Sequence, residues 1–167
     1  VRQGLDYLPE PGKAAPHAAI RAQAGLGKTT VVLEELAAVA AGKTTHFYAP
    51  THDLAEEVAA KARALGLRVR VIKGRSKPIG DDQFMCKKHE IAEAVAAAGL
   101  PVWKSLCEDR EGLAAQCEHF NSCPYVRQFR DLEGHLIVMT HEWLTLPKGR
   151  MPAADFNVID ETFFHKL

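Results

Sequence analysis

A glycine-rich run near the start of the chain has the residue types that hold phosphate groups. Between an extended apolar segment (17–21) and a helix-forming segment (30–41) come the residues Ala22-Gln23-Ala24-Gly25-Leu26-Gly27-Lys28-Thr29. Glycines let backbone N–H groups turn toward phosphate oxygens, and the following helix adds partial positive charge. Lys28 can reach the outer phosphates, and the Thr29 hydroxyl can bind Mg²⁺. We therefore expect a loop that binds ATP with Mg²⁺ through Ala24, Gly25, Leu26, Gly27, Lys28, Thr29 and Thr30. A chance Gly-Lys-Thr turn is the alternative, and the strand–loop–helix setting argues against it.

The second candidate for chemistry is an acidic run near the end of the chain, Val158-Ile159-Asp160-Glu161. Its β-branched residues predict a strand whose carboxyl end carries both carboxylates, and ligands of open α/β sheets bind at that edge. We expect Asp160 to hold Mg²⁺ together with Thr29, and Glu161 to deprotonate the attacking water. A solvated strand end is the alternative, which the upstream loop disfavours. The predicted catalytic residues are therefore Lys28, Asp160 and Glu161.

All four cysteines of the chain fall in one stretch, as Cys86, Cys107, Cys117 and Cys123. The intervals between them are 20, 9 and 5 residues, so there is no Cys-x-x-Cys pair. Four thiolates suit a [4Fe–4S] cluster or a tetrahedral Zn²⁺ equally in ligand count. In a zinc site, His89 or His119 could replace a thiolate. Disulfides do not suit a chain with an ATP-type motif and no signal peptide, which leaves four unrelated buried thiols as the alternative.

Strand and helix patterns alternate on both sides of the cysteine stretch. Runs at 17–21, 44–49, 67–72, 135–140 and 156–160 predict strands, and runs at 30–41 and 53–65 predict helices. We expect the second helix to begin at a capping box formed by Asp53 and Glu56. The expected apolar stripes are Val32, Leu36 and Val39 on the first helix, and Leu54, Val58, Ala62 and Leu65 on the second. This order predicts right-handed parallel crossovers, and so an α/β fold with a parallel doubly wound sheet.

The cysteine stretch interrupts this alternation. From 73 to 130 we expect no clear strand, a helix at 90–98 and a helix at 125–132. The expected apolar face of the first of these helices is Ile91, Val95 and Ala98. The sequence therefore predicts one domain built from 1–72 and 131–167, with a mainly helical, Cys-containing insertion at 73–130.

Length and composition are those of one sizeable globular domain. The chain has 167 residues, of which 47% are hydrophobic and 25% charged, and its formal net charge is +0. Any contact with nucleic acid must therefore be local. There is no apolar run of about 20 residues and no visible signal peptide, so we expect no membrane partner and a cytoplasmic location. Because the chain starts at Val1 and ends soon after the acidic run, we expect it to be part of a longer protein.

Taken in order, these motifs resemble the first motor domain of the iron–sulfur superfamily 2 helicases, the XPD and DinG type. Residues 22–29 resemble helicase motif I in its Ala-first form, and residues 158–161 resemble motif II. Residues 48–54 (Tyr-Ala-Pro-Thr-His-Asp-Leu) resemble motif Ia, and 138–144 resemble the segment before motif II. Lys-Gly-Arg-Ser at 73–76 and Cys-Pro-Tyr at 123–125 are similar to runs beside the first and last cluster cysteines of that family.

The resemblance implies a RecA-like P-loop domain that is the N-terminal part of an ATP-dependent DNA helicase or translocase. It implies single-stranded or forked DNA as partner, and a second motor domain beyond Leu167 that supplies an arginine to ATP. This chain alone should therefore hydrolyse ATP very slowly. The resemblance implies DNA contacts at Thr51, His52, Lys73 and Arg75. Arg127 and Arg130 could also contact DNA, and Trp103 or Phe129 could stack on its bases. The alternative is that the two arginines are solvated and the two aromatic residues belong to the core.

The sequence differs from that family at two places, so other classes of protein are also considered. Thr162-Phe163 stand where the family usually has Ala-His, and the cysteine intervals match neither named type. A phage- or plasmid-type primase–helicase relative is therefore also considered, with a bacterial, phage or plasmid origin. The rival interpretation is a P-loop ATPase that acts as a switch, with the cysteine stretch as a zinc-stabilised protein-docking module.

Overall fold

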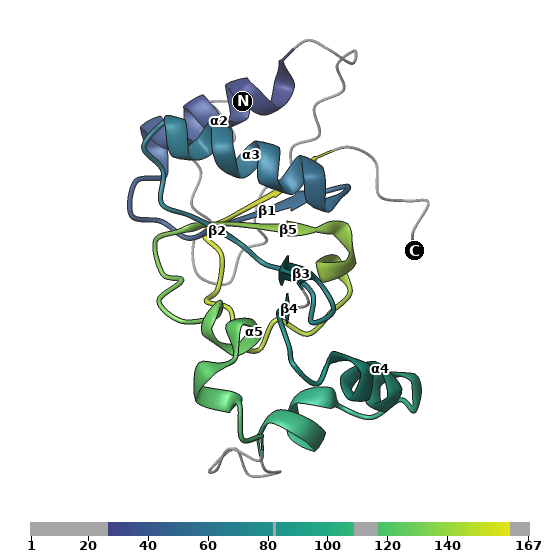
Figure 1. Ribbon diagram of the computed structural model, residues 1–167. Coiled ribbons are helices and arrows are strands. Elements are labelled where there is room, and N and C mark those ends of the chain that lie inside the picture. The colour runs from purple at the N-terminus through teal and green to yellow at the C-terminus, as the bar shows by residue number, and fades with distance from the viewer. Residues whose placement is uncertain (1–26, 82, 109–116, 161–167) are drawn as a thin grey trace. The chain divides into compact units, whose positions relative to one another are not determined.

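The computed structural model describes residues 27–81, 83–108 and 117–160 of the chain (Figure 1). The chain divides into two compact units. The first is Val1–Ile72 with Leu132–Leu167, and the second is Lys73–Asp131. Each unit is described by itself below.

Among the described residues, a parallel sheet of four strands forms the centre of the first unit, and the strand predicted at 17–21 lies outside those residues. Its strands are β1 (Thr45–Ala49), β2 (Val69–Val71), β5 (Leu136–Thr140) and β6 (Phe156–Ile159). They lie in the order β2-β5-β1-β6, and each pairs in parallel with its neighbour. Every residue of β1 and β5 is buried, as is usual for the central strands of a parallel sheet. The predicted α/β class is confirmed, and β2 lies at an end of the described sheet as its polar alternation predicts.

Two long helices, α2 (Lys28–Val39) and α3 (His52–Ala64), pack side by side on one face of this sheet (Figure 1). They share one core with the strands, because α2 buries Leu33 and Leu36 against it. From α3, the buried residues are Ala55, Val58, Ala59 and Ala62. Alanine side chains let α3 approach the strands closely, and the spacing of large apolar residues along a helix does not predict this. The expected stripe is therefore right at Val58 and Ala62 but wrong at Leu54 and Leu65, which are 39% and 41% exposed.

The N-terminus of α3 differs from its predicted form. Thr51 has extended backbone angles, and its hydroxyl accepts a hydrogen bond from the Leu54 N–H at 3.3 Å. The N-cap is therefore Thr51, and the capping box predicted at Asp53 is wrong. Asp53 lies in the first turn instead, where its negative charge complements the helix dipole.

The opposite face of the sheet is also buried. His46 and Tyr48 of β1 and Ile137 and Met139 of β5 are each at most 3% exposed. The short 3₁₀-helix η3 (His141–Leu144) contacts β1, and the Lys148 ammonium lies 5.2 Å from the centre of the Tyr48 ring. Within the described residues, both long helices of this unit lie on the other face, so the doubly wound arrangement stays a prediction.

The second unit consists of short elements. Its strands β3 (Pro78–Gly80) and β4 (Gln83–Phe84) form an antiparallel pair, so the expectation of no strand here is wrong. Its helical segments are α4 (His89–Ala97), the π-helical turn η1 (Trp103–Cys107), the 3₁₀-turn η2 (Phe120–Ser122) and α5 (Pro124–Arg127). The residue of α4 that is buried is Ala92, whereas Ile91 from the expected stripe is 53% exposed. Among the residues that the structure describes, no helix is both long and apolar enough to cross a membrane.

His46 is a buried titratable group whose burial predicts pH-dependent stability. Burial lowers its pKa, and the positive charge of Lys148 lowers it further. Below about pH 6.5, the unfolded chain therefore binds a proton that the folded chain resists. We expect the free energy of unfolding to fall as the pH drops from 7 to 5, and to fall less in His46→Gln. Urea unfolding at several pH values between 5 and 7 measures how the free energy of unfolding changes with pH in each protein. The same pH dependence in wild type and His46→Gln would contradict the effect expected from His46.

Candidate functional site

The carboxyl ends of the parallel strands meet at one edge of the sheet in the first unit. At this edge, β1 leads through Pro50 to the α3 N-cap Thr51, β5 leads into His141, and β6 leads into Asp160. Ligands of open α/β sheets bind outside such an edge. The candidate site is therefore built from the residues that follow these strands and from the helix that approaches them.

One hydrogen bond joins the two ends of the predicted nucleotide site. The Thr29 hydroxyl donates to Asp160 Oδ2 at 2.9 Å, across 131 residues of sequence. Both residues are partly buried. The structure thus brings together the two residues for which the sequence predicts Mg²⁺ binding.

The helix α2 begins at this contact. Gly27 precedes it with φ of 71°, a left-handed conformation that glycine adopts without strain, and its carbonyl accepts from the Val31 N–H at 3.1 Å. The first residues of the helix are Lys28 and Thr29, so the N–H groups of the first helical turn and the positive end of the helix dipole lie at the sheet edge. Of the other predicted nucleotide-site residues, Thr30 follows in the first turn. Those outside the described residues are Ala24, Gly25, Leu26 and Glu161.

Asp160 is held through its main chain as well as its side chain. Its N–H donates to the Tyr48 carbonyl at 3.0 Å, which extends the β1–β6 ladder by one bond. His141 Nε2 lies 2.8 Å from the Asp160 carbonyl oxygen. His141 is 5% exposed, and the site residues predicted from sequence do not include it. Three different elements therefore fix the position of one carboxylate.

In the second unit, the four cysteine segments are tied together in pairs. The Met85 carbonyl lies 3.6 Å from Cys123 Sγ and accepts from the Tyr125 N–H at 2.9 Å, which joins the first and last segments. The Cys117 N–H donates to the Cys107 carbonyl at 3.4 Å. A salt bridge from Lys88 to Glu118, at 2.8 Å, joins the segment after Cys86 to the segment after Cys117. The structure therefore brings together all four predicted ligand segments.

The thiols differ in burial. Cys86, Cys107 and Cys123 are each at most 8% exposed, and Cys117 is partly exposed. Burial raises the pKa of the Cys86 thiol, and a hydrogen bond from the Lys88 backbone and the Arg75 charge act in the opposite direction. Within the described residues, no three His, Cys, Asp or Glu side chains are placed to hold a metal ion. A bound metal would require the thiols to turn toward a common centre and lose their protons.

Arg75 lies inside the cysteine-rich unit. Its guanidinium carbon is 4.0 Å from the centre of the Tyr125 ring and 5.9 Å from that of Trp103. Nη2 donates to Cys107 Sγ at 3.6 Å, and the Arg75 carbonyl accepts from the Cys86 N–H at 2.9 Å. Arg75 is therefore partly buried and contacts other residues of this unit beside two cysteines, and its predicted DNA contact stays a prediction.

The remaining predicted nucleic-acid residues have varied positions. Thr51 is exposed at the α3 N-cap and His52 is partly exposed beside it. The backbone of Lys73 bonds to the Gln128 side chain through both its N–H and its carbonyl. Trp103 and Phe129 pack in an aromatic cluster with Phe120 and Tyr125, which favours their core interpretation. Arg127 and Arg130 are exposed.

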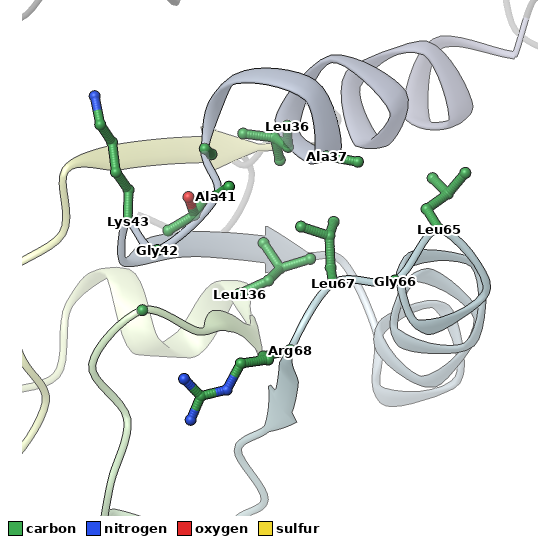
Figure 2. A pocket seen from close by; sticks show the side chains of 13 residues that line it. Leu36, Ala37, Ala41, Gly42, Lys43, Leu65, Gly66, Leu67, Arg68 and Leu136 are labelled. Atoms are coloured by element: carbon green, nitrogen blue, oxygen red, sulfur yellow. The ribbon is translucent and has the colours of Figure 1, made fainter.

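A pocket of the first unit lies at the other edge of the sheet (Figure 2). It is lined by the last turn of α2, by residues that follow α2 and α3, and by the starts of β1 and β5, among them Leu36, Leu67 and Leu136. Thr45 begins β1 and Leu136 begins β5, so this pocket is at the amino ends of the strands. It is therefore distinct from the edge at which Thr29 meets Asp160.

Comparison of the chain with protein-family models, with curated proteins and with solved structures finds no match. The chemistry of the site therefore rests on the contacts described above.

The position of Arg75 predicts that Arg75→Lys destabilises the chain by about 1–2 kcal/mol. Lysine keeps the charge but loses the planar stacking on Tyr125 and the directed N–H to Cys107. Urea unfolding measures the loss, and Arg130→Lys, at an exposed position, is the matched control with no expected change. Equal stability of both variants would contradict an internal role for Arg75.

Proposed function

We propose that the chain is the nucleotide-binding part of an ATP-dependent DNA helicase or translocase. The observation that supports this most strongly is the hydrogen bond from Thr29 to Asp160. A hydroxyl at the start of a helix and a carboxylate at the end of a parallel strand are the pair that holds Mg²⁺ in P-loop NTPases. The sequence around each residue predicts the same role independently.

The geometry of this pair suits a cation. Because the Thr29 hydroxyl gives its proton to Asp160 Oδ2, the oxygen lone pairs of Thr29 remain for a ligand. Mg²⁺, when bound with ATP, would neutralise negative charge on the phosphates. The fit is good, since hydroxyl and carboxylate oxygens are the ligands that this ion prefers.

The other residues act on the nucleotide itself. The backbone N–H groups at the start of α2 and the Lys28 ammonium bind phosphate oxygens. Glu161 takes a proton from the attacking water, and Asp160 and Thr29 keep the phosphates oriented. In the helicases that the chain resembles, a second motor domain supplies an arginine that completes hydrolysis, and we expect slow turnover of ATP without that arginine.

A thiolate-bound metal in the cysteine-rich unit is part of the proposal. Its support is the pairing of the four cysteine segments and the Arg75 N–H directed at Cys107. The chemistry of the donor set suits a [4Fe–4S] cluster or Zn²⁺, held by Cys86, Cys107, Cys117 and Cys123.

DNA is the proposed partner because of the residues beside the nucleotide site. Thr51 and His52 begin α3 at the carboxyl edge of the sheet, within the stretch that resembles helicase motif Ia. N–H groups at a helix N-terminus suit the phosphates of a nucleic-acid backbone. The rival class, an ATPase switch with a protein-docking module, would bind nucleotide in the same way but would not bind DNA.

Nucleotide binding is tested with two substitutions at the loop. We expect Lys28→Ala to abolish ATP binding, because it removes the phosphate-binding ammonium. Thr29→Val should leave metal-free nucleotide binding in place and remove the gain in affinity given by Mg²⁺, whereas Thr29→Ser keeps the hydroxyl and the gain. Titration of a fluorescent ATP analogue with and without Mg²⁺ measures both effects.

Unchanged ATP affinity in Lys28→Ala would refute the loop assignment. ATP binding without binding of single-stranded or forked DNA, in a protein extended to its full length, would favour the switch over the helicase.

The metal is identified by an absorption spectrum and elemental analysis of anaerobically purified protein. We expect a stoichiometric amount of metal. An iron–sulfur cluster would give bound iron and an absorption band at about 400 nm, whereas a zinc site would give bound zinc and a colourless protein. Cys86→Ser should lose most of it, because a hydroxyl replaces a thiolate ligand. Metal-free wild-type protein, or a Cys86→Ser variant with the wild-type metal content, would contradict the proposed centre.

A further inference from the structure

The carbonyl of Asp160 lies where the β1–β6 ladder comes to an end. The Asp160 N–H still bonds to Tyr48 of β1, at 3.0 Å. In a parallel ladder the next bond runs from the N–H two residues further along the partner strand, which here is residue 50. Residue 50 is proline and has no N–H to donate. The Asp160 carbonyl therefore needs a donor from elsewhere.

His141 is that donor. It follows the last residue of β5, and β5 lies on the far side of β1 from β6. Its side chain thus passes the end of β1 to bring Nε2 within 2.8 Å of the Asp160 carbonyl oxygen. A carbonyl can accept but not donate, so Nε2 must carry the hydrogen.

The bond from His141 also affects the proposed Mg²⁺ site. The Asp160 side chain accepts from Thr29 Oγ1, while its backbone N–H is held by Tyr48 and its backbone carbonyl by His141. With both backbone groups of Asp160 held, its Cα–Cβ bond has a fixed direction, and the carboxylate is preorganised toward Thr29. Without the bond to His141, only the N–H side of the Asp160 backbone would be held by a strand bond.

We propose that His141 is a positioning residue of the nucleotide site, which sets the affinity of the Asp160–Thr29 pair for Mg²⁺. This inference rests on the proposed function. The chemistry is that of an outer-shell hydrogen bond, where loss of the partner typically lowers metal affinity about 10–100-fold.

Two amide substitutions separate this role from simple packing. The amide nitrogen of Gln lies about as far along its side chain as Nε2 does in His, whereas that of Asn falls short. We expect His141→Gln to keep the bond and the wild-type Mg²⁺ requirement. In His141→Asn, half-maximal binding of a fluorescent ATP analogue should need about 10-fold more Mg²⁺. Metal-free nucleotide affinity should be the same in all three proteins.

Each outcome has a defined meaning. Equal Mg²⁺ midpoints in His141→Asn and wild type would overturn the positioning role while leaving the proposed function standing. Loss of metal-free and Mg²⁺-dependent affinity together in His141→Asn, with His141→Gln unaffected, would show a general structural role and overturn the inference as well. A wild-type chain that binds no nucleotide would overturn the proposed function itself. If His141→Asn does not fold, His141→Leu is measured against His141→Gln with the same expectations.

Discussion

The candidate site depends on one hydrogen bond between residues 131 positions apart, from the Thr29 hydroxyl to the Asp160 carboxylate. This bond is possible because all four strands of the sheet run in parallel, so that β6 ends at the edge where α2 begins. Burial of both faces of β1 and β5 makes that arrangement costly to change. The chemistry proposed for the chain thus follows from the direction of its strands as much as from its residue types.

The strands and the two principal site residues could be predicted because their signals are local. Runs of aromatic or β-branched residues mark β1, β5 and β6, and the Gly-Lys-Thr and Asp-Glu runs are together typical of a nucleotide site. The face that α3 buries could not be predicted, because the alanines at 55, 59 and 62 pack against strands that are distant in sequence. The role of His141 could not be predicted for a similar reason. The signal for it is Pro50, which removes a ladder donor, but its meaning requires knowing that β1 lies between β5 and β6.

The cysteine-rich unit shows a second limit of sequence patterns. Its core is not a periodic stripe but a set of irregular contacts, in which Arg75 lies on the Tyr125 ring and bonds to Cys107. Short elements of two to nine residues leave few periods to detect, and a cation packed on an aromatic ring has no local signature. The sequence therefore does not reveal that the partly buried Arg75 also packs within this unit.

If Thr29 and Asp160 act as one unit on Mg²⁺ and nucleotide, the effects of removing them should not add. A double-mutant cycle with Thr29→Val and Asp160→Asn, read out as the affinity for ATP in the presence of Mg²⁺, measures this coupling. We expect strong non-additivity, with the double variant little weaker than either single variant, and no such coupling when Mg²⁺ is removed by chelation. Additive losses in the presence of Mg²⁺, or the same coupling without it, would show that the two residues do not bind Mg²⁺ as a pair.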